Sequence, residues 1–405
     1  MKHILLSLLL LITVFMPVQA QINLAQTDDF KGLAEFGHAI ADKRIVMLDE
    51  LTHGEHQNFL LKAKLVRYLH QHHGFDVLLL ESGLYDVAKV WENEKTPIVD
   101  QAAGNIFYMY AHSTALQMLF DYIDSARSSE SPLILSGFDG RLSGELSRHQ
   151  VGEELGKAIA HLPPSLVQGV DVPRFKILTE AIIDRDIEKF ERTELLDYID
   201  TAYVLRDLLE MNQSSVKPFE SDGYRSRLIE GLAFVAQSLV GERRHDEHDI
   251  PMANNVKWLL DNPFKNKKVI VWGHFVHLNY AGFIEKHYDN LGSLLRQAYG
   301  TDVYHAHIGA AGGQYRDYVS MAVKNITPSQ YHIEPKLAQA HQLDDHQALF
   351  ISGDQLHKLA QASAEGAQFF GHQYRLDIPV AQWQRYWDGM FVIGGSTASE
   401  AQPTQ

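Results

Sequence analysis

Short apolar segments that end in ionisable residues recur along this 405-residue chain, and they constrain its fold more than any other feature. The first runs from Arg44 to Leu48 and is followed at once by Asp49 and Glu50. A helical pattern then covers residues 55–73, with Gly74 as its C-cap, and the apolar run FDVLLLES begins directly afterwards. A strand, a helix and a second buried strand in this order predict a βαβ unit with parallel strands.

The pattern recurs farther along the chain. Strands are predicted near Ile134, at KKVIVWGH and at DVYHAHIG, whereas the chain is strongly helical between about residues 144 and 262. The sequence therefore predicts an α/β fold: a mainly parallel central sheet flanked by helices, with a large helical insertion. We place the α/β domain in residues 21–145 and 263–395, the insertion in residues 146–262 and a disordered tail in residues 396–405.

Residues 1–20 have the pattern of a cleavable secretory signal. Lys2 and His3 precede an apolar run from Ile4 to Met16, and Val18-Gln19-Ala20 is a small-residue cleavage site. The run is too short for a good transmembrane span, although an uncleaved anchor is the alternative. We therefore expect a periplasmic or secreted protein with no membrane contact after the signal is removed.

Composition excludes several functions. The chain has no cysteine, so a disulfide framework and a thiol nucleophile are ruled out. The formal net charge of −15 argues against nucleic acid as the main partner.

Ionisable residues stand where the predicted strands end. In open parallel sheets, ligands bind in the crevice outside the carboxyl ends of the strands. The residues at these ends are Glu50, Glu81, Asp139 and His274. We expect their side chains to gather around one cavity.

His53, three residues after Glu50, indicates the chemistry of this cavity. A histidine is a natural general base near neutral pH, because its unperturbed pKa is about 6.5. A neighbouring carboxylate can fix the imidazole tautomer, and a second histidine can stabilise the oxyanion that forms when a carbonyl is attacked. The set predicts hydrolysis by an activated water.

These residues resemble the erythromycin esterase family. The segment LDELTHGEHQNFLLKAKLVRYLHQHHGFDVLLLES is similar to the family's opening strand, helix and strand, and LSGFD at residues 135–139 resembles its Gly-Phe-Asp segment. The segment MANNVKWLLDNPFKNKKVIVWGHFVHLN resembles its Met-Ala-x-Asn helix, strand and paired histidines, and NLGSLLRQAYGTDVYHAHIGAAGG continues the likeness. The resemblance covers most of the chain in order, and the helical middle matches only as helix.

The resemblance implies hydrolysis of an ester or macrolactone, a small-molecule substrate, without an acyl-enzyme. His53 would be the general base, Glu50 and Glu81 would orient it or the water, and His274 would polarise the carbonyl. The candidate substrate-binding residues are Lys62, His277, Asp139 and His56.

Three departures from the family pattern leave the substrate open. Asp49 replaces the usual Gly before Glu50, and Phe275 stands where the histidine pair usually encloses an Asn. His248-Asp249 occupies a place where Arg-Asp is common. The residues that the resemblance assigns to water activation, Glu50, His53, Glu81 and His274, still match the family pattern.

Two other functions compete with ester hydrolysis. We expect no cofactor, although His53-x-x-His56 and His274-x-x-His277, with Glu50 and Glu81, could bind a divalent metal. Distant relatives of this fold resemble metal-dependent peptidases and haem-binding proteins, so a metallopeptidase and a non-catalytic binder of haem or another ligand are the alternatives. A serine nucleophile is disfavoured, because neither Ser82 nor Ser136 lies in a Gly-x-Ser-x-Gly elbow.

Overall fold

The computed structural model describes residues 20–211, 217–282, 288–371 and 377–400. The chain separates into two compact units. The first takes in Met1–Leu78, Tyr108–Leu133 and Lys267–Gln405, and the second takes in Leu79–Phe107 and Ile134–Asn266. The predicted signal, residues 1–20, lies outside the described residues apart from Ala20.

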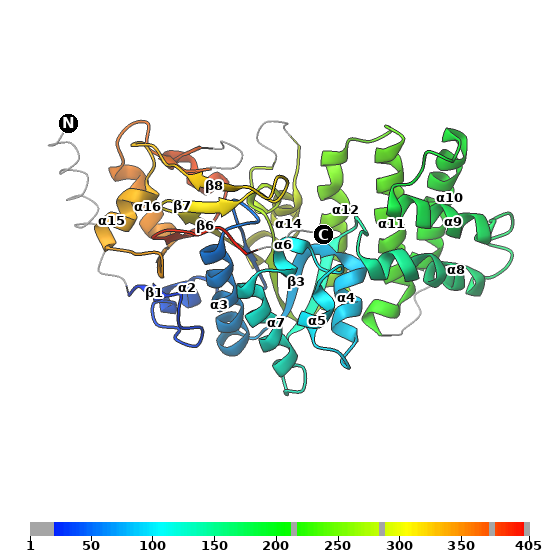
Figure 1. The fold of residues 1–405 in the computed structure, drawn as a ribbon, viewed down its shortest axis with the longest axis horizontal. Coiled ribbons are helices and arrows are strands. Elements are labelled where there is room, and N and C mark those ends of the chain that lie inside the picture. Colours follow the sequence, from blue (N-terminus) through cyan, green and yellow to red (C-terminus); the bar gives the residue numbers. More distant parts are fainter. Residues whose placement is uncertain (1–19, 212–216, 283–287, 372–376, 401–405) are drawn as a thin grey trace. The chain divides into compact units, whose positions relative to one another are not determined.

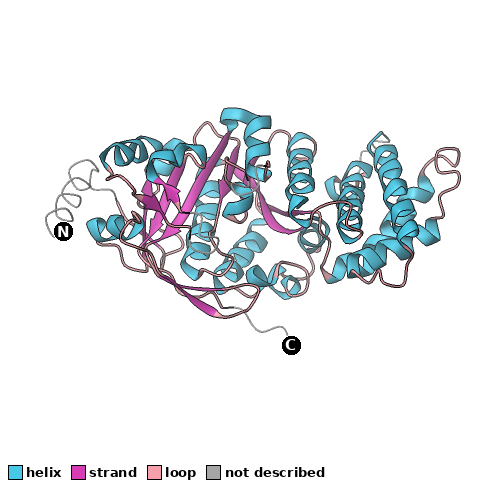
Figure 2. Ribbon diagram, turned by 90° about the horizontal axis from the view of Figure 1, so that it is seen from above, coloured by secondary structure: helices cyan, strands magenta, loops and turns pink. Residues whose placement is uncertain are grey.

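A central sheet organises the first unit (Figure 1). Its strands, in spatial order, are β1 (Ile22–Asn23), β9 (Gln347–Ile351), β12 (Gly389–Ile393), β6 (Val303–Ala310), β2 (Ile45–Leu48), β5 (Lys268–Trp272) and β3 (Phe75–Gly83). Helices lie on both sides of these strands (Figure 2). Two small antiparallel pairs complete the strands of this unit: β7 (Gly313–Arg316) with β8 (Val323–Ile326), and β10 (Gln368–Phe369) with β11 (Ile378–Pro379).

The helices of the first unit connect these strands. They are α2 (Ala34–Ala39), α3 (His56–His73), α6 (Tyr108–Ala111), α7 (Thr114–Ala126), α13 (Phe275–Leu278), α14 (Leu291–Tyr299), α15 (Glu334–His341) and α16 (Gly353–Ala362). Two short 3₁₀ turns, η4 (Gly300–Asp302) and η5 (Val380–Arg385), belong to the same unit. None of the helices among the described residues combines the length and the apolar character needed to cross a bilayer.

Strand β2 lies between two parallel neighbours. Ile45 is level with Val269 of β5 on one side and with Val303 of β6 on the other. All four residues of β2 are buried, as expected for a parallel strand whose two faces are covered. Strand β6 also pairs in parallel with β12, so the predicted mainly parallel sheet flanked by helices is confirmed.

The far edge of the sheet is not parallel. Strand β9 runs antiparallel to β12, and the two-residue strand β1 runs antiparallel to β9. Strands β9 and β12 were not predicted from the sequence. The position of β5 between the two strands of the first βαβ unit was not predicted either.

Helix α3 links β2 to β3 and ends where the sequence indicates. Gly74 has a φ of 69°, and its N–H bonds to the Leu69 carbonyl oxygen. Glycine adopts this left-handed conformation without steric cost, so the helix ends there and β3 begins at the next residue.

The second unit is mainly helical. It contains the end of β3, β4 (Ile134–Asp139), α4 (Leu84–Glu92), α5 (Ile98–Ala102), η1 (Ser147–Val151), α8 (Gly152–His161), α9 (Val172–Asp184), α10 (Arg192–Met211), η2 (Pro218–Glu220), α11 (Asp222–Leu239), η3 (His245–His248) and α12 (Asp249–Asp261). Helices α10 and α11 pack along one another. The unit is larger than the predicted insertion at residues 146–262, because it also includes residues 79–107 and β4.

The predicted disorder of the C-terminal tail is wrong for residues 396–400. The Thr397 N–H donates to Gln57 Oε1 at 2.6 Å, and the Ser399 N–H donates to the Gly54 carbonyl oxygen at 2.8 Å. Ala398 forms a β-bridge with Glu55. Backbone pairing orders this polar segment, and composition does not reveal such pairing. Residues 401–405 lie outside the described residues.

Candidate active site

Glu50 and His53 form a hydrogen-bonded pair where β2 gives way to α3. His53 Nδ1 lies 2.8 Å from Glu50 Oε1. Glu50 is fully buried, and His53 is 7% exposed. The structure therefore brings together the two residues that the sequence places three positions apart.

Three donors converge on the Glu50 carboxylate. His53 Nδ1 and the Tyr110 hydroxyl both contact Oε1, the hydroxyl at 2.6 Å, and the Lys62 ammonium forms an ion pair with Oε2. Burial raises the pKa of Glu50, but Lys62 and His53 outweigh it, so the pKa lies below its ordinary value. Glu50 is therefore ionised at neutral pH and can only accept hydrogen bonds.

The charge on Glu50 fixes the tautomer of His53. Since the carboxylate only accepts, His53 Nδ1 carries a proton and donates it in the bond to Oε1. The neutral imidazole then has its lone pair on Nε2. His53 is therefore a base whose lone pair has a defined position.

Lys62 is held in place from two sides. Its side chain is fully buried in α3, and its Nζ lies 4.2 Å from the centre of the Trp272 ring, at the end of β5. A desolvated ammonium over an indole gains cation–π stabilisation in addition to its ion pair. The cation predicted from the sequence thus contacts Glu50 directly.

A second imidazole faces His53. The rings of His53 and His274 have centroids 4.8 Å apart. His274 is the N-cap residue of α13, and its Nδ1 accepts the Val276 backbone N–H at 3.1 Å. A nitrogen that accepts cannot carry the proton, so the neutral His274 tautomer is protonated on Nε2. His53 and His274 therefore have opposite tautomers.

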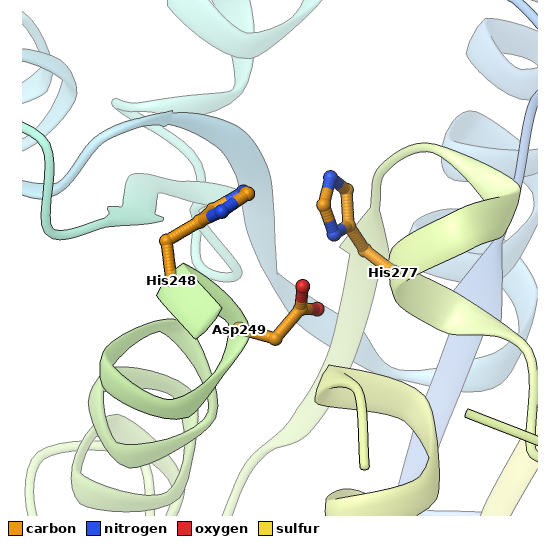
Figure 3. Close-up of side chains that lie close together, drawn as sticks. All are labelled: His248, Asp249 and His277. Carbon is orange, nitrogen blue, oxygen red and sulfur yellow. The ribbon is translucent and has the colours of Figure 1, made fainter. Parts of the chain in front are cut away.

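His277 lies one turn farther along α13 (Figure 3). Its ring centroid is 6.3 Å from that of His274, and the residue is 7% exposed. It is near the His53–His274 pair, and its role in substrate binding stays a prediction.

The β7–β8 hairpin covers one side of His53. The Tyr318 ring meets the His53 ring edge-on, with centroids 5.1 Å apart. The Tyr108 hydroxyl donates to the Tyr318 carbonyl oxygen, and the Arg316 N–H donates to that of Gly54 at 2.9 Å. A Cβ at Gly54 would overlap the Arg316 carbonyl oxygen, so only glycine permits this close approach.

Asp49 organises a separate cluster on β6. Its Oδ2 contacts His305 Nε2 and His307 Nδ1, each at 2.8 Å, and its Oδ1 accepts the Ile308 N–H at 2.8 Å. Burial raises the pKa of Asp49, but His307 and His305 outweigh it and hold the pKa well below its usual range. His305 Nδ1 lies 2.9 Å from the Tyr386 carbonyl oxygen, so both His305 nitrogens face acceptors. His305 is therefore a buried imidazolium paired with the Asp49 carboxylate.

Glu81 and Asp139 belong to the second unit. Asp139, at the end of β4, pairs with Arg141, whose Nη2 lies 2.6 Å from Oδ2. Burial raises the pKa of Asp139, but Arg141 and then His248 lower it below its usual value. Burial lowers the pKa of Arg141, but Asp139, Glu81 and Asp249 outweigh it and raise the pKa.

These residues form a charged cluster within the second unit. Two of its members, His248 and Asp249, stand at the start of α12 (Figure 3). The predicted gathering of Glu81 and Asp139 with Glu50 around one cavity stays a prediction.

His56 lies against the C-terminal segment. It is the first residue of α3, and its backbone N–H donates to the Thr397 carbonyl oxygen at 3.0 Å. Burial lowers the pKa of His56, and Glu400 opposes this shift. Its role in substrate binding stays a prediction.

Sequence reasoning missed Tyr110, Trp272 and Tyr318. Tyr110 lies 60 positions after its partner Glu50, in the four-residue helix α6. No motif connects the two segments, so the contact follows only from the fold. Trp272 ends a predicted strand, but its contact with Lys62 of α3 follows only from the fold.

Known proteins are similar to this chain in sequence and in fold. The family described as erythromycin esterase matches residues 70–387. The protein named "Putative hydrolase YbfO" of Bacillus subtilis (strain 168) is 26% identical over 346 residues, covering 79% of this chain and 76% of YbfO.

Three solved structures share the fold. A succinoglycan biosynthesis protein superposes with a TM-score of 0.73 at 15% identity, covering 99% of this chain and 98% of its own. A Bacillus cereus protein superposes with a TM-score of 0.71 at 19% identity, covering 95% of this chain and 97% of its own. A mutant of erythromycin esterase EreC in its open conformation superposes with a TM-score of 0.67 at 16% identity, covering 95% of this chain and 99% of its own.

The family match spans most of the chain and includes β3, β4, β5 and β6, which carry Glu81, Asp139 and the approach to His274. Glu50 and His53 precede its first matched residue. With the shared α/β fold and a curated relative among the hydrolases, this match shows that the chain belongs to the erythromycin esterase family and is a hydrolase of that type.

Proposed function

We propose that this hydrolase cleaves a carboxylic ester or macrolactone with a water molecule activated by His53. The observation that carries the proposal is the approach of the His53 and His274 rings to 4.8 Å, with His53 Nδ1 on the Glu50 carboxylate and His274 Nδ1 accepting the Val276 N–H; these partners assign opposite tautomers to the two rings. One ring offers a lone pair and the other an N–H. Attack of water on a carbonyl requires these two functions at close range.

His53 acts as the general base. Its Nε2 removes a proton from the water while the water oxygen bonds to the carbonyl carbon. The imidazolium that forms is stabilised by the Glu50 carboxylate, 2.8 Å from Nδ1. Glu50 stays ionised through this step, because the Lys62 ammonium is paired with its other oxygen.

His274 acts on the carbonyl oxygen. Its Nε2–H donates to the oxygen as negative charge develops there, and the Val276 N–H holds the ring in the tautomer that this requires. The tetrahedral intermediate then breaks its bond to the leaving oxygen. The departing alkoxide takes the proton from His53, which leaves an acid, an alcohol and the neutral base.

We propose that this reaction needs no metal ion. Both oxygens of Glu50 already face donors, and one of them is the Lys62 ammonium. A divalent cation bound to Glu50 would have to displace or closely approach this ammonium, which like-charge repulsion opposes. The family description supports an ester or macrolactone as the proposed substrate class, and the departure at Asp49 leaves the individual substrate open.

A hydrolysis screen tests the proposed function. The purified mature protein is assayed against macrolactones, simple esters and peptides, with and without a strong chelator. We expect turnover of at least one ester or macrolactone, unchanged by the chelator. Peptide cleavage that requires added metal, or saturable haem binding without any turnover, would overturn the proposal in favour of one of the alternative functions.

We also propose that the protein is exported. The support is the basic, apolar and small-residue order of residues 1–20. N-terminal sequencing of protein recovered from the periplasm or medium should begin near Gln21. Protein that keeps Met1 in the cell would contradict export with cleavage.

A further inference from the structure

Tyr110 shares one carboxylate oxygen with His53. Its hydroxyl donates to Glu50 Oε1 at 2.6 Å, and His53 Nδ1 lies 2.8 Å from the same oxygen. The hydroxyl oxygen is also 3.4 Å from Nδ1. All three polar groups are buried, so the phenol competes directly with the imidazole for the charge on Oε1.

The surroundings of Tyr110 fix the direction of its hydroxyl. The ring packs edge-on against Phe59 of α3, with centroids 5.6 Å apart, and against Trp272 of β5, with centroids 6.0 Å apart. The same Trp272 ring holds Lys62. The phenol and the ammonium therefore reach Glu50 from one rigid aromatic wall.

Other ionisable groups among the described residues of the first unit also face this pair. Lys62 of α3 meets Glu50 Oε2, His274 faces the His53 ring ahead of α13, and Tyr318 of the β7–β8 hairpin meets the same ring edge-on. Tyr110 differs from His274 and Tyr318 because it donates to the carboxylate that stabilises the base.

A donor to Glu50 weakens the pull of the carboxylate on the His53 proton. A hydrogen bond from a neutral hydroxyl to a buried carboxylate is short and strong, and it spreads the negative charge over the donor. Less charge then remains to stabilise the imidazolium. Without the phenol, His53 would hold its catalytic proton more tightly and would become protonated at higher pH.

We propose that Tyr110 is a positioning residue that, through Glu50, keeps His53 in its basic form near neutral pH. This inference rests on the role proposed for His53. The inference adds a residue that does not touch the substrate, and it predicts the direction in which loss of that residue changes the pH profile. The phenol makes His53 a weaker base, so a larger fraction of His53 is unprotonated at a given pH. Removal of the phenol should therefore shift the pH profile to higher pH.

The test compares wild type with Tyr110→Phe, which keeps the ring and removes only the hydroxyl. In kcat/KM against pH, we expect the midpoint of the acid limb to rise by about 0.5–1 pH unit, as expected for the loss of one charge-assisted hydrogen bond transmitted through a shared oxygen. KM should change little, and plateau kcat should stay within about tenfold of wild type.

A matched control removes a buried phenol hydroxyl elsewhere. Tyr198 is buried in α10, and its hydroxyl lies 3.1 Å from that of Thr179. Tyr198→Phe should leave the acid limb unchanged, although both variants lose a buried hydrogen bond. An unshifted limb in Tyr110→Phe, or a shift to lower pH, would overturn the inference.

A second measurement does not depend on enzyme activity. Histidine-labelled protein is titrated by NMR, and the His53 signal is assigned with His53→Gln. The His53 midpoint should move to higher pH in Tyr110→Phe and stay in place in Tyr198→Phe. If no ester is hydrolysed, the proposed function fails while this titration still decides the role of Tyr110; an unmoved His53 midpoint would refute that role alone.

Discussion

Asp49 and Glu50 are adjacent in the sequence and fully buried, yet their carboxylates organise two different clusters. Glu50 meets His53, Tyr110 and Lys62, whereas Asp49 meets His305 and His307 of β6. Consecutive residues at a strand end point to opposite faces of the sheet, which separates the two groups.

The two clusters differ in the partners of their imidazole rings. In the Asp49 cluster, both nitrogens of His305 face protein acceptors, and His307 stacks on Trp387 with centroids 4.3 Å apart. In the Glu50 cluster, His53 Nδ1 bonds to Glu50 and the His53 ring faces His274. A buried His–carboxylate pair therefore does not by itself identify a base, because His305 in the Asp49 cluster forms the same kind of pair and faces a protein acceptor with its other nitrogen.

The largest expected effect is the loss of the cation beside Glu50. Lys62→Met keeps the length of the side chain and leaves Glu50 buried without its ion pair. Removing one partner of a buried pair destabilises a protein by about 3–5 kcal/mol. Urea unfolding should show this loss, and activity should fall with it.

Lys62→Arg is the matched control, since it keeps the charge next to Glu50. It should recover most of the stability lost in Lys62→Met. If Lys62→Met is less than about 1 kcal/mol below wild type, the ion pair is not a major part of the site.

Glu334 tests whether charged partners or burial determine the pKa values of these buried carboxylates. It is fully buried in α15 with no cationic partner among the described residues, and its Oε1 accepts the Phe370 N–H at 2.9 Å. Burial raises the pKa of Glu334 to about 7 from 4.5. The carboxylates of Asp49 and Glu50 have lowered pKa values despite equal burial, because imidazoles and an ammonium surround them.

The raised pKa of Glu334 gives a stability effect of defined sign. Between pH 4.5 and 7 the folded state holds this proton while the unfolded state releases it, so stability falls as pH rises through this window. Glu334→Gln removes the penalty, which at pH 8 is about 3 kcal/mol by linkage. Thermal unfolding should show the variant near wild type at pH 4.5 and more stable at pH 8; equal differences at both pH values would contradict this.

Asp49→Asn separates the structural cluster from the reactive one. The amide cannot neutralise the buried His305 imidazolium, and its N–H₂ group faces ring nitrogens that donate. We expect a loss of about 2 kcal/mol in urea unfolding, the cost of a hydrogen bond to a charged group.

The pH dependence of activity should be unchanged in Asp49→Asn, because the Asp49 carboxylate is bound to His305, His307 and the Ile308 N–H of β6. Asp345→Asn, at a half-exposed position beside His346, is the control and should change stability little. A shifted acid limb in Asp49→Asn would show that the two clusters are not independent.

The smallest effect is expected at the hairpin. Tyr318→Ala removes the ring that meets His53 edge-on and leaves the Tyr108 contact to the Tyr318 carbonyl intact. An aromatic pair is worth about 0.5–1.5 kcal/mol, so kcat/KM should fall by roughly tenfold or less. Tyr318→Phe should retain wild-type activity, and a larger loss in Tyr318→Phe would mean that the hydroxyl takes part in the reaction.

The sequence predicted the parts of this molecule that local pattern determines. The apolar run at residues 44–48, the helix ending at Gly74 and the strands at β3, β4, β5 and β6 follow from periodicity and capping. Glu50 and His53 could be paired because they lie three residues apart. The order of strands could not be deduced, since the placement of β5 between β2 and β3 depends on packing across the whole sheet.

The missed residues depend on contacts between distant segments. Tyr110 and Glu50 are 60 positions apart, and Asp49 and His307 are 258 positions apart. Asp49 departs visibly from the family pattern, but its histidine partners on β6 could not be identified from the sequence. The order found in residues 396–400 has the same cause, because their partners lie at the start of α3.

The most direct test of the central claim is kcat/KM of His53→Ala on a substrate found in the ester screen, measured at the plateau pH of wild type. A group that acts as general base contributes about 10²–10⁴-fold, so a loss of this size is expected in a folded variant. His72→Ala, at an exposed position in the last turn of the same helix, should keep wild-type activity. Activity of His53→Ala within tenfold of wild type would contradict the claim that this imidazole activates the water.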